Sequence, residues 1–209
     1  AKFGDIRCFV CFCRHIRTEF MRRFADRHST ADSCGLFNRY DSIDNNNGEK
    51  KMKRNLTLLT DFYELTMMNG YFEDGTHNNE AVFDMFFRYK PDLNYAIFAG
   101  LEQALDYVEN LHFGEDEIDY LRSLGSFDER FLDYLKDFKF TGEIYSAVEG
   151  EVVFPGEPIL IVKAPLAQAQ LLETAILNII GHQTLIATKT SRIVEAANGK
   201  SVIEFGLRR

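Results

Sequence analysis

Two adjacent arginines, Arg208 and Arg209, are the residues whose type and place first suggest chemistry. They follow the run 201–205, whose β-branched and aromatic residues predict a strand that emerges from a helix. Folds of α/β type bind ligands just past the carboxyl ends of such strands, and a guanidinium group can hold carboxylate or phosphate oxygens through paired hydrogen bonds. Taken alone, the pair is better explained as a solvated charged terminus. Glu204 is open to two interpretations, an orienting partner of Arg208 or an ion-pair partner without a catalytic role.

A second group of reactive side chains lies near the start of the chain, where Cys8, Cys11 and Cys13 precede His15. Thiolates and imidazoles are common zinc ligands. The spacing is crowded, however, and no second matching pair follows it, so we expect no metal site here.

Charge is distributed unevenly along the sequence. Residues 1–51 carry ten lysines and arginines against seven acidic residues, whereas 52–209 carry fourteen against twenty-five. Nucleic-acid binding requires a basic surface, so we expect no nucleic-acid partner. No apolar run approaches the roughly 20 residues that cross a bilayer. All four cysteines lie in the first segment, so residues 52–209 contain none. The absence of cysteine from that longer segment fits a reducing compartment. We therefore expect a cytoplasmic protein without a membrane partner.

The chain divides into three parts by pattern. Residues 1–51 lack a sustained period and end in a polar run, and we interpret them as a disordered or spurious leader. Residues 52–197 have clear periodicity and predict an amino-terminal α/β domain with connecting helices. Residues 198–209 predict the first strand of an α/β barrel that is truncated here.

Capping residues and apolar spacing predict the individual elements. Thr60 is expected to cap a helix that stops at Gly70, and Asn198-Gly199 to end a long one. The predicted elements are a strand at 80–89, three helices near 98–108, 118–124 and 131–135, a compact β-unit at 142–163, a helical region at 166–197 and a strand at 201–205.

An ordered set of short motifs resembles the nicotinate phosphoribosyltransferase family. The motifs span 52–209 and are Leu59-Thr60-Asp61-Phe62-Tyr63-Glu64-Leu65-Thr66-Met67, Gly70-Tyr71, Tyr95-Ala96-Ile97-Phe98-Ala99-Gly100-Leu101, Phe140-Thr141-Gly142, Glu149-Gly150, Phe154-Pro155-Gly156-Glu157-Pro158, Gln170-Leu171-Leu172-Glu173-Thr174, Thr184-Leu185-Ile186-Ala187-Thr188-Lys189 and Glu204-Phe205-Gly206-Leu207-Arg208-Arg209. No single motif is decisive, but their order is specific. The resemblance implies a sandwich-like α+β amino-terminal domain set against an irregular α/β barrel.

The resemblance also implies a reaction: nicotinate joins phosphoribosyl pyrophosphate in NAD biosynthesis, coupled to ATP, with Mg²⁺ on the pyrophosphate. It implies that Tyr63 contacts the pyridine ring across a homodimer interface, that Arg208 and Arg209 bind anionic groups, and that Glu204 lies beside them. An aromatic face suits a flat heteroaromatic acid. The family's phosphorylatable histidine lies beyond Arg209, so the catalytic residues are unknown in this chain and we expect the fragment to be inactive.

Two alternatives remain open at this level. The nearest enzymatic one is a relative that uses nicotinamide or quinolinate. The other is a non-catalytic binding module or a biotinyl or lipoyl carrier, because the turn-rich stretch 149–158 is similar to that of carrier domains. Such a carrier would need Lys163 exposed at a hairpin tip.

Overall fold

The structure is a computed structural model that describes residues 55–206 and the backbone of strand β1 (Phe9–Cys11). The predicted leader lies outside the described residues except for β1. The side chains of the cysteine and histidine group, and those of Arg208 and Arg209, also lie outside them.

An antiparallel sheet forms the centre of the described region. Its strand order is β1-β2-β6-β4, with β2 at Glu80–Met85, β6 at Leu160–Pro165 and β4 at Glu143–Ser146. In this register Val162 lies opposite both Phe83 and Ile144. Strand β6 is rich in aliphatic residues and is buried over most of its length, as expected for a central strand. The predicted strand at 80–89 therefore forms, but it ends at Met85.

A second, two-stranded sheet pairs β3 (Ala96–Ile97) with β5 (Val152–Val153). The prediction of one compact β-unit at 142–163 is therefore wrong, because β4 and β6 belong to the larger sheet and β5 does not. The cause is a long-range pairing: Gly150 N donates to Phe98 O at 2.8 Å, and Phe98 N donates to Glu151 O at 2.9 Å. Local turn signals do not reveal such a partner.

The described part of the chain contains six helices. The predicted amphipathic helices are confirmed, and the long helical region is interrupted at Leu172. The helices are α2 (Phe62–Glu73), α3 (Leu101–Glu109), α4 (Glu115–Ser123), α5 (Glu129–Lys136), α6 (Leu166–Leu171) and α7 (Glu173–Ala196).

Helix α2 differs from its prediction at both ends. Asp61, not Thr60, occupies the capping position, because the Thr60 hydroxyl donates to the Glu64 carboxylate instead. The helix also runs through Gly70 to Glu73. Gly70 does not stop it, since an isolated glycine costs only about 1 kcal/mol in a helix interior and tertiary packing overrides that cost.

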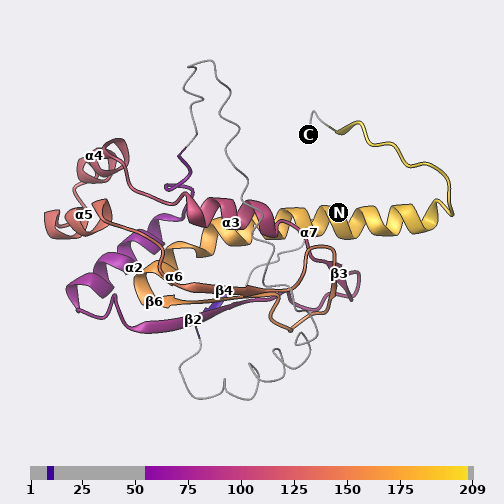
Figure 1. Cartoon of the computed structure of the whole chain (residues 1–209), viewed down its shortest axis with the longest axis horizontal. Helices are drawn as coiled ribbons and strands as arrows, with labels where there is room; N and C mark the ends of the chain where they lie inside the picture. The colour runs from indigo at the N-terminus through magenta and orange to yellow at the C-terminus, as the bar shows by residue number, and fades with distance from the viewer. Residues whose placement is uncertain (1–8, 12–54, 207–209) are drawn as a thin grey trace. The chain divides into compact units, whose positions relative to one another are not determined.

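One apolar core joins the sheet to the helices. Helix α6 contacts β2, β6 and α2, so helices cover one face of the sheet (Figure 1). Helix α7 runs on from α6 and contacts α3 and β3. The largest fully buried side chains of the core include Phe87, Phe98, Phe131, Met68 and Leu171. No helix in the described residues is long and apolar enough to cross a membrane.

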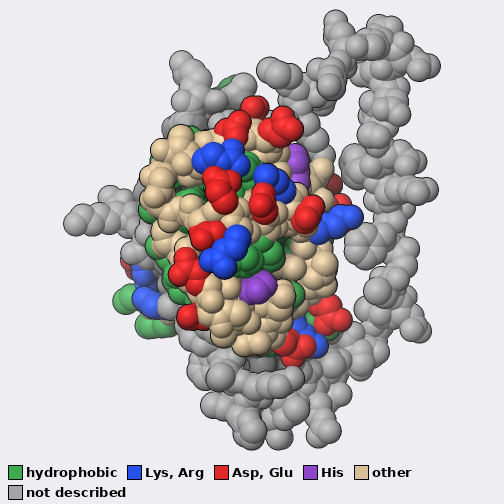
Figure 2. Space-filling model, turned by 90° about the vertical axis from the view of Figure 1, so that its left-hand side faces the viewer, with side chains coloured by type: hydrophobic (Ala, Val, Ile, Leu, Met, Phe, Trp, Pro, Cys, Tyr) green, Lys and Arg blue, Asp and Glu red, His purple; other side chains and the backbone are tan. Residues whose placement is uncertain are grey.

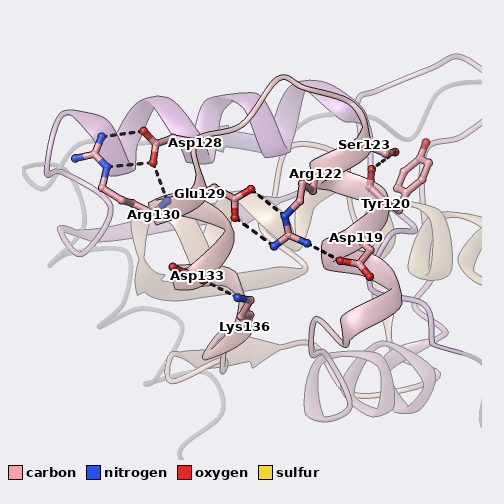
Figure 3. Close-up of polar contacts among 9 residues, drawn as sticks. All are labelled: Asp119, Tyr120, Arg122, Ser123, Asp128, Glu129, Arg130, Asp133 and Lys136. Atoms are coloured by element: carbon pink, nitrogen blue, oxygen red, sulfur yellow. Dashed lines mark hydrogen bonds and ion pairs between the residues drawn. The ribbon is translucent and has the colours of Figure 1, made fainter.

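Helices α4 and α5 form a hairpin held at its surface by ion pairs (Figure 3). Arg122 of α4 joins the two helices, with Nε 2.8 Å from Oε1 of Glu129 and Nη1 2.5 Å from Oδ1 of Asp119. Asp128 caps α5 by accepting from Arg130 N at 2.7 Å. Figure 2 shows that acidic side chains outnumber basic ones on this side of the molecule.

The segment after α7 contradicts the predicted strand at 201–205. Asn198 and Gly199 have φ values of 47° and 80° and end the helix, as predicted. Residues 201–205 then pair with no other strand in the described region, and their side chains are exposed. An extended segment becomes a strand only when a neighbour supplies the hydrogen-bond ladder. The mixed helix and sheet class is confirmed, but residues 55–206 contain no closed barrel.

Candidate functional site

Tyr63, the predicted pyridine-contacting residue, lies in the first turn of α2. It is 44% exposed, and its hydroxyl lies within the electrostatic reach of the Glu173 carboxylate at the start of α7. Helix α2 has Leu65 and Met68 in the core, so Tyr63 is presented on the outer face. The site is therefore built where the amino-terminal ends of two helices meet.

A buried carboxylate follows Tyr63 in the helix. Glu64 is 0% exposed, and it accepts three hydrogen bonds from threonines on the two helix ends. The Thr174 amide donates to Glu64 Oε1 at 3.0 Å, the Thr174 hydroxyl donates to the same oxygen, and the Thr60 hydroxyl donates to Oε2. Asp61 adds a fourth link, because its amide donates to the Thr174 hydroxyl at 3.2 Å. These bonds fasten the start of α2 to the start of α7.

The electrostatics of the cluster are dominated by burial and by like charge. Burial raises the pKa of Glu64 to about 7 from its ordinary 4.5, the threonine hydrogen bonds oppose the rise, and the charge of Glu173 adds to it. Burial also raises the pKa of Glu173. Burial raises the pKa of Tyr63, and the neighbouring carboxylates of Glu173, Glu64 and Asp61 raise it further. Tyr63 therefore stays protonated at neutral pH.

Tyr107 of α3 extends the cluster into the core. Its hydroxyl is buried and has no hydrogen-bond partner. Burial raises its pKa, and the charge of Glu64 raises it further, which places the hydroxyl within the electrostatic reach of that carboxylate. A buried hydroxyl without a hydrogen-bond partner lowers the free energy of unfolding by about 1–3 kcal/mol, so Tyr107 destabilises this part of the fold.

Helix α7 is held in place by two buried threonines further along it. The Thr188 hydroxyl accepts from Ile97 N at 2.8 Å, and the Thr184 hydroxyl accepts from Ala99 N at 3.1 Å. The two hydroxyls thus accept hydrogen bonds from backbone amides at the end of β3 and just after it. This gives Thr184 and Thr188, both in the motif 184–189, a structural role.

Glu149 has a comparable structural role at the start of α3. Its two carboxylate oxygens accept from Gly100 N at 2.8 Å and from Leu101 N at 2.9 Å. Backbone amides at a helix start otherwise lack partners, and a carboxylate there is favoured by the helix dipole. The motif Glu149-Gly150 is thus explained by capping.

The structure does not bring the predicted site residues together. Tyr63 lies near the first residue of α7, whereas Glu204 follows the end of that helix, whose 24 residues span about 36 Å. Glu204 is exposed. Arg208 and Arg209 lie outside the described residues, so their predicted anion-binding role stays a prediction.

Sequence reasoning missed the carboxylates around Tyr63. Glu64 carried a detectable signal, because it shares the buried face of α2 with Leu65 and Met68, where a charged residue is unexpected. Glu173 lies in a motif of the resemblance but carried no assigned role. Its proximity to Tyr63 depends on how α2 and α7 pack, which no local pattern encodes.

Lys163 does not have the geometry of a carrier lysine. It lies within β6, between β2 and β4, and its Nζ is 3.4 Å from Glu80 Oε2 and 3.9 Å from Glu143 Oε2. A modifiable lysine must project from an exposed turn, so the carrier alternative is wrong. Across residues 55–206, no three histidine, cysteine or acidic side chains gather closely enough to hold a metal ion.

The sequence is similar to nicotinate phosphoribosyltransferases. Residues 58–181 match the family model of the nicotinate phosphoribosyltransferase N-terminal domain. The nicotinate phosphoribosyltransferase of Bacillus subtilis is 48% identical over 155 residues, which cover 74% of this chain and 32% of that protein. The one from Caenorhabditis elegans is 44% identical over 157 residues, covering 73% and 28%.

A solved structure agrees with the sequence matches. A crystal structure of human nicotinic acid phosphoribosyltransferase superposes with a TM-score of 0.66 at 32% identity, over 73% of this chain and 31% of that one. The chain thus spans about a third of the length of these relatives.

Proposed function

Because the chain belongs to the nicotinate phosphoribosyltransferase family, we propose that it supplies the amino-terminal part of an enzyme that joins nicotinate to phosphoribosyl pyrophosphate in NAD biosynthesis. The observation that carries this proposal is the match over 58–181, which includes all of α2, the start of α7 and the Tyr63 cluster between them. In this reaction the pyridine nitrogen displaces pyrophosphate from the anomeric carbon.

Within this proposal, Tyr63 contacts the pyridine ring. Tyr63 is exposed, whereas the nearby Glu64 is buried and Glu173 is half-buried. A flat aromatic ring offers a large apolar contact area with little conformational freedom to lose. Arg208 and Arg209 are proposed to bind the anionic groups of the substrates, with Glu204 beside them.

A homodimer is the proposed assembly. Leu59, Phe62 and Met67 lie close to Tyr63 in the sequence and are each about two-fifths to one-half exposed. Contiguous exposed apolar side chains mark protein interfaces more often than solvent-facing surface. The exposed face of α2 is therefore the proposed contact, which would bring Tyr63 to the interface.

ATP and Mg²⁺ are proposed cofactors of the complete enzyme, in the cytoplasm. The described residues do not fit a Mg²⁺ site, since Glu64 is occupied by three hydrogen bonds and no triad of ligands gathers elsewhere in 55–206. We therefore assign no step of the reaction to a metal ion held by this region.

A hybrid enzyme tests the proposed function. Residues 55–206 replace the matching region of the Bacillus subtilis enzyme, and formation of nicotinate mononucleotide is measured with nicotinate, nicotinamide or quinolinate as the substrate. We expect turnover with nicotinate within about tenfold of the parent, because the barrel residues of the parent are retained. A soluble, folded hybrid that prefers nicotinamide or quinolinate would favour the alternative family members instead.

A further inference from the structure

The first turn of α2, which carries Tyr63, lacks a cap from its own capping residue. In the described part of the chain, the side chain of Asp61 accepts no hydrogen bond from the amides of that turn. The first amides of a helix have no partner within the helix, and a first turn without a side-chain cap is less stable. The contacts that this turn makes with α7 therefore matter for its order.

Thr174 of α7 holds this turn on both sides of Tyr63. Its hydroxyl accepts from the Asp61 amide at 3.2 Å and donates to the Glu64 carboxylate. Its own amide donates to Glu64 Oε1 at 3.0 Å, and its Oγ1 lies 3.2 Å from Asp61 Oδ2. Thr174 thus binds the residue two positions before Tyr63 and the residue directly after it.

The burial of Glu64 makes this attachment difficult to replace. Glu64 is 0% exposed, and the Thr60 hydroxyl donates to its second oxygen. A buried polar group that loses a protein partner cannot turn to water instead, and its free-energy cost is that of an unmade hydrogen bond. Without the Thr174 hydroxyl, the carboxylate would have to shift toward another donor, and the turn that carries it would shift too.

We propose that Thr174 is a positioning residue, whose hydroxyl fixes the first turn of α2 and with it the place from which Tyr63 reaches the pyridine ring of the substrate. This inference rests on the function proposed above. Thr174 acts through Tyr63 and does not itself touch the substrate. Such an indirect role can have a large effect, since a misplacement of about 1 Å can cost about 100-fold in rate.

The first arm of the test uses the 209-residue chain and does not depend on activity. Thr174→Val keeps the branched shape of threonine without its hydroxyl, whereas Thr174→Ser keeps the hydroxyl. The measurement is the backbone order parameter of residues 61–64 from ¹⁵N relaxation. In Thr174→Val it should fall from about 0.85, typical of rigid backbone, toward about 0.6, and in Thr174→Ser it should stay near the parent value.

Thr188→Val is the matched control. The Thr188 hydroxyl also lies on α7 and also accepts from a backbone amide, that of Ile97 at 2.8 Å. It is 14 residues from Thr174, about 21 Å along the helix. Thr188→Val should lower the melting temperature and leave the order parameters of 61–64 unchanged.

The second arm measures steady-state kinetics in the hybrid enzyme. Thr174→Val should raise the KM for nicotinate about fivefold to tenfold with kcat within about twofold, because it misplaces a contact made with bound substrate. Thr174→Ser should restore the KM, and Thr188→Val should not raise it. The double variant of Tyr63→Ala with Thr174→Val should have the KM of Tyr63→Ala alone, since Thr174 acts only through Tyr63.

The outcomes separate the two proposals. If Tyr63→Ala raises the KM while Thr174→Val leaves it unchanged, the positioning role is refuted and the proposed function stands. An equal rise in KM in Thr188→Val would also refute the positioning role, because general destabilisation would then explain the effect. If Tyr63→Ala itself leaves the KM unchanged, the proposed contact between Tyr63 and nicotinate fails and the positioning role fails with it.

Discussion

At the scale of single residues, Glu64 is the most unusual side chain of the described region. It is a carboxylate with no exposed surface, surrounded by threonine donors and by other acidic groups. Its hydrogen bonds lower the cost of burial but do not remove it, because its pKa remains raised to about 7. The folded chain therefore holds this proton more tightly than the unfolded chain does.

This shift predicts how stability depends on pH. The folded pKa of Glu64 exceeds its ordinary value of 4.5. Its contribution to folding is therefore fully present below about pH 4.5 and is lost as the pH rises through about 7. A shift of this size corresponds to about 3 kcal/mol. The melting temperature of the 209-residue chain should be higher at pH 5 than at pH 8, and Glu64→Gln should reduce that difference.

Glu102→Gln is the control for this experiment, since Glu102 is an exposed carboxylate in the first turn of α3. It should retain the full pH dependence. An equally steep dependence in Glu64→Gln would show that other groups carry the effect, and it would contradict the account of the buried carboxylate.

At the scale of elements, two glycines of the family-like motifs have opposite surroundings. A Cβ added at Gly142 would lie 2.4 Å from the Cβ of Ala164 and 2.6 Å from the carbonyl oxygen of Lys163, both on the adjacent β6. A Cβ added at Gly70, inside α2, would meet nothing within 4 Å. Gly142 is therefore required by close packing, and Gly70 is not.

The two positions give a matched pair of substitutions. Gly142→Ala should destabilise the chain by about 1–3 kcal/mol, because the strand backbone must move. Gly70→Ala should stabilise it by about 0.5–1 kcal/mol, because alanine favours the helix and finds open space. Chemical denaturation of both variants measures these changes. Equal effects at the two positions would contradict the packing described for β6.

Elements with a strong local signal could be predicted from sequence, and those that depend on a distant partner could not. The apolar spacing of Phe131, Leu132 and Leu135 predicts α5, and all three residues are fully buried. By contrast, β5 pairs with β3 more than fifty residues earlier, and the run 201–205 has the composition of a strand without a described partner. In the site, Tyr63 was predicted through the resemblance. Its proximity to Glu173 arises only when α2 and α7 pack together.

At the scale of the whole molecule, the described residues form a folded region that carries part of the proposed site. Tyr63 is presented on the outer face of α2, but Arg208 and Arg209 lie outside the described residues, and the chain spans only about a third of the length of its relatives. We therefore predict that the 209-residue chain alone does not consume phosphoribosyl pyrophosphate when nicotinate is added. Turnover comparable with that of the Bacillus subtilis enzyme would contradict this prediction.

The central claim is that this chain supplies the surface that receives nicotinate. The KM for nicotinate in the hybrid enzyme, measured with Tyr63 and with Tyr63→Ala, tests it most directly. The account predicts a rise of about tenfold or more in KM, because the ring face contributes binding energy that alanine cannot replace. An unchanged KM in a folded, active Tyr63→Ala hybrid would contradict the claim.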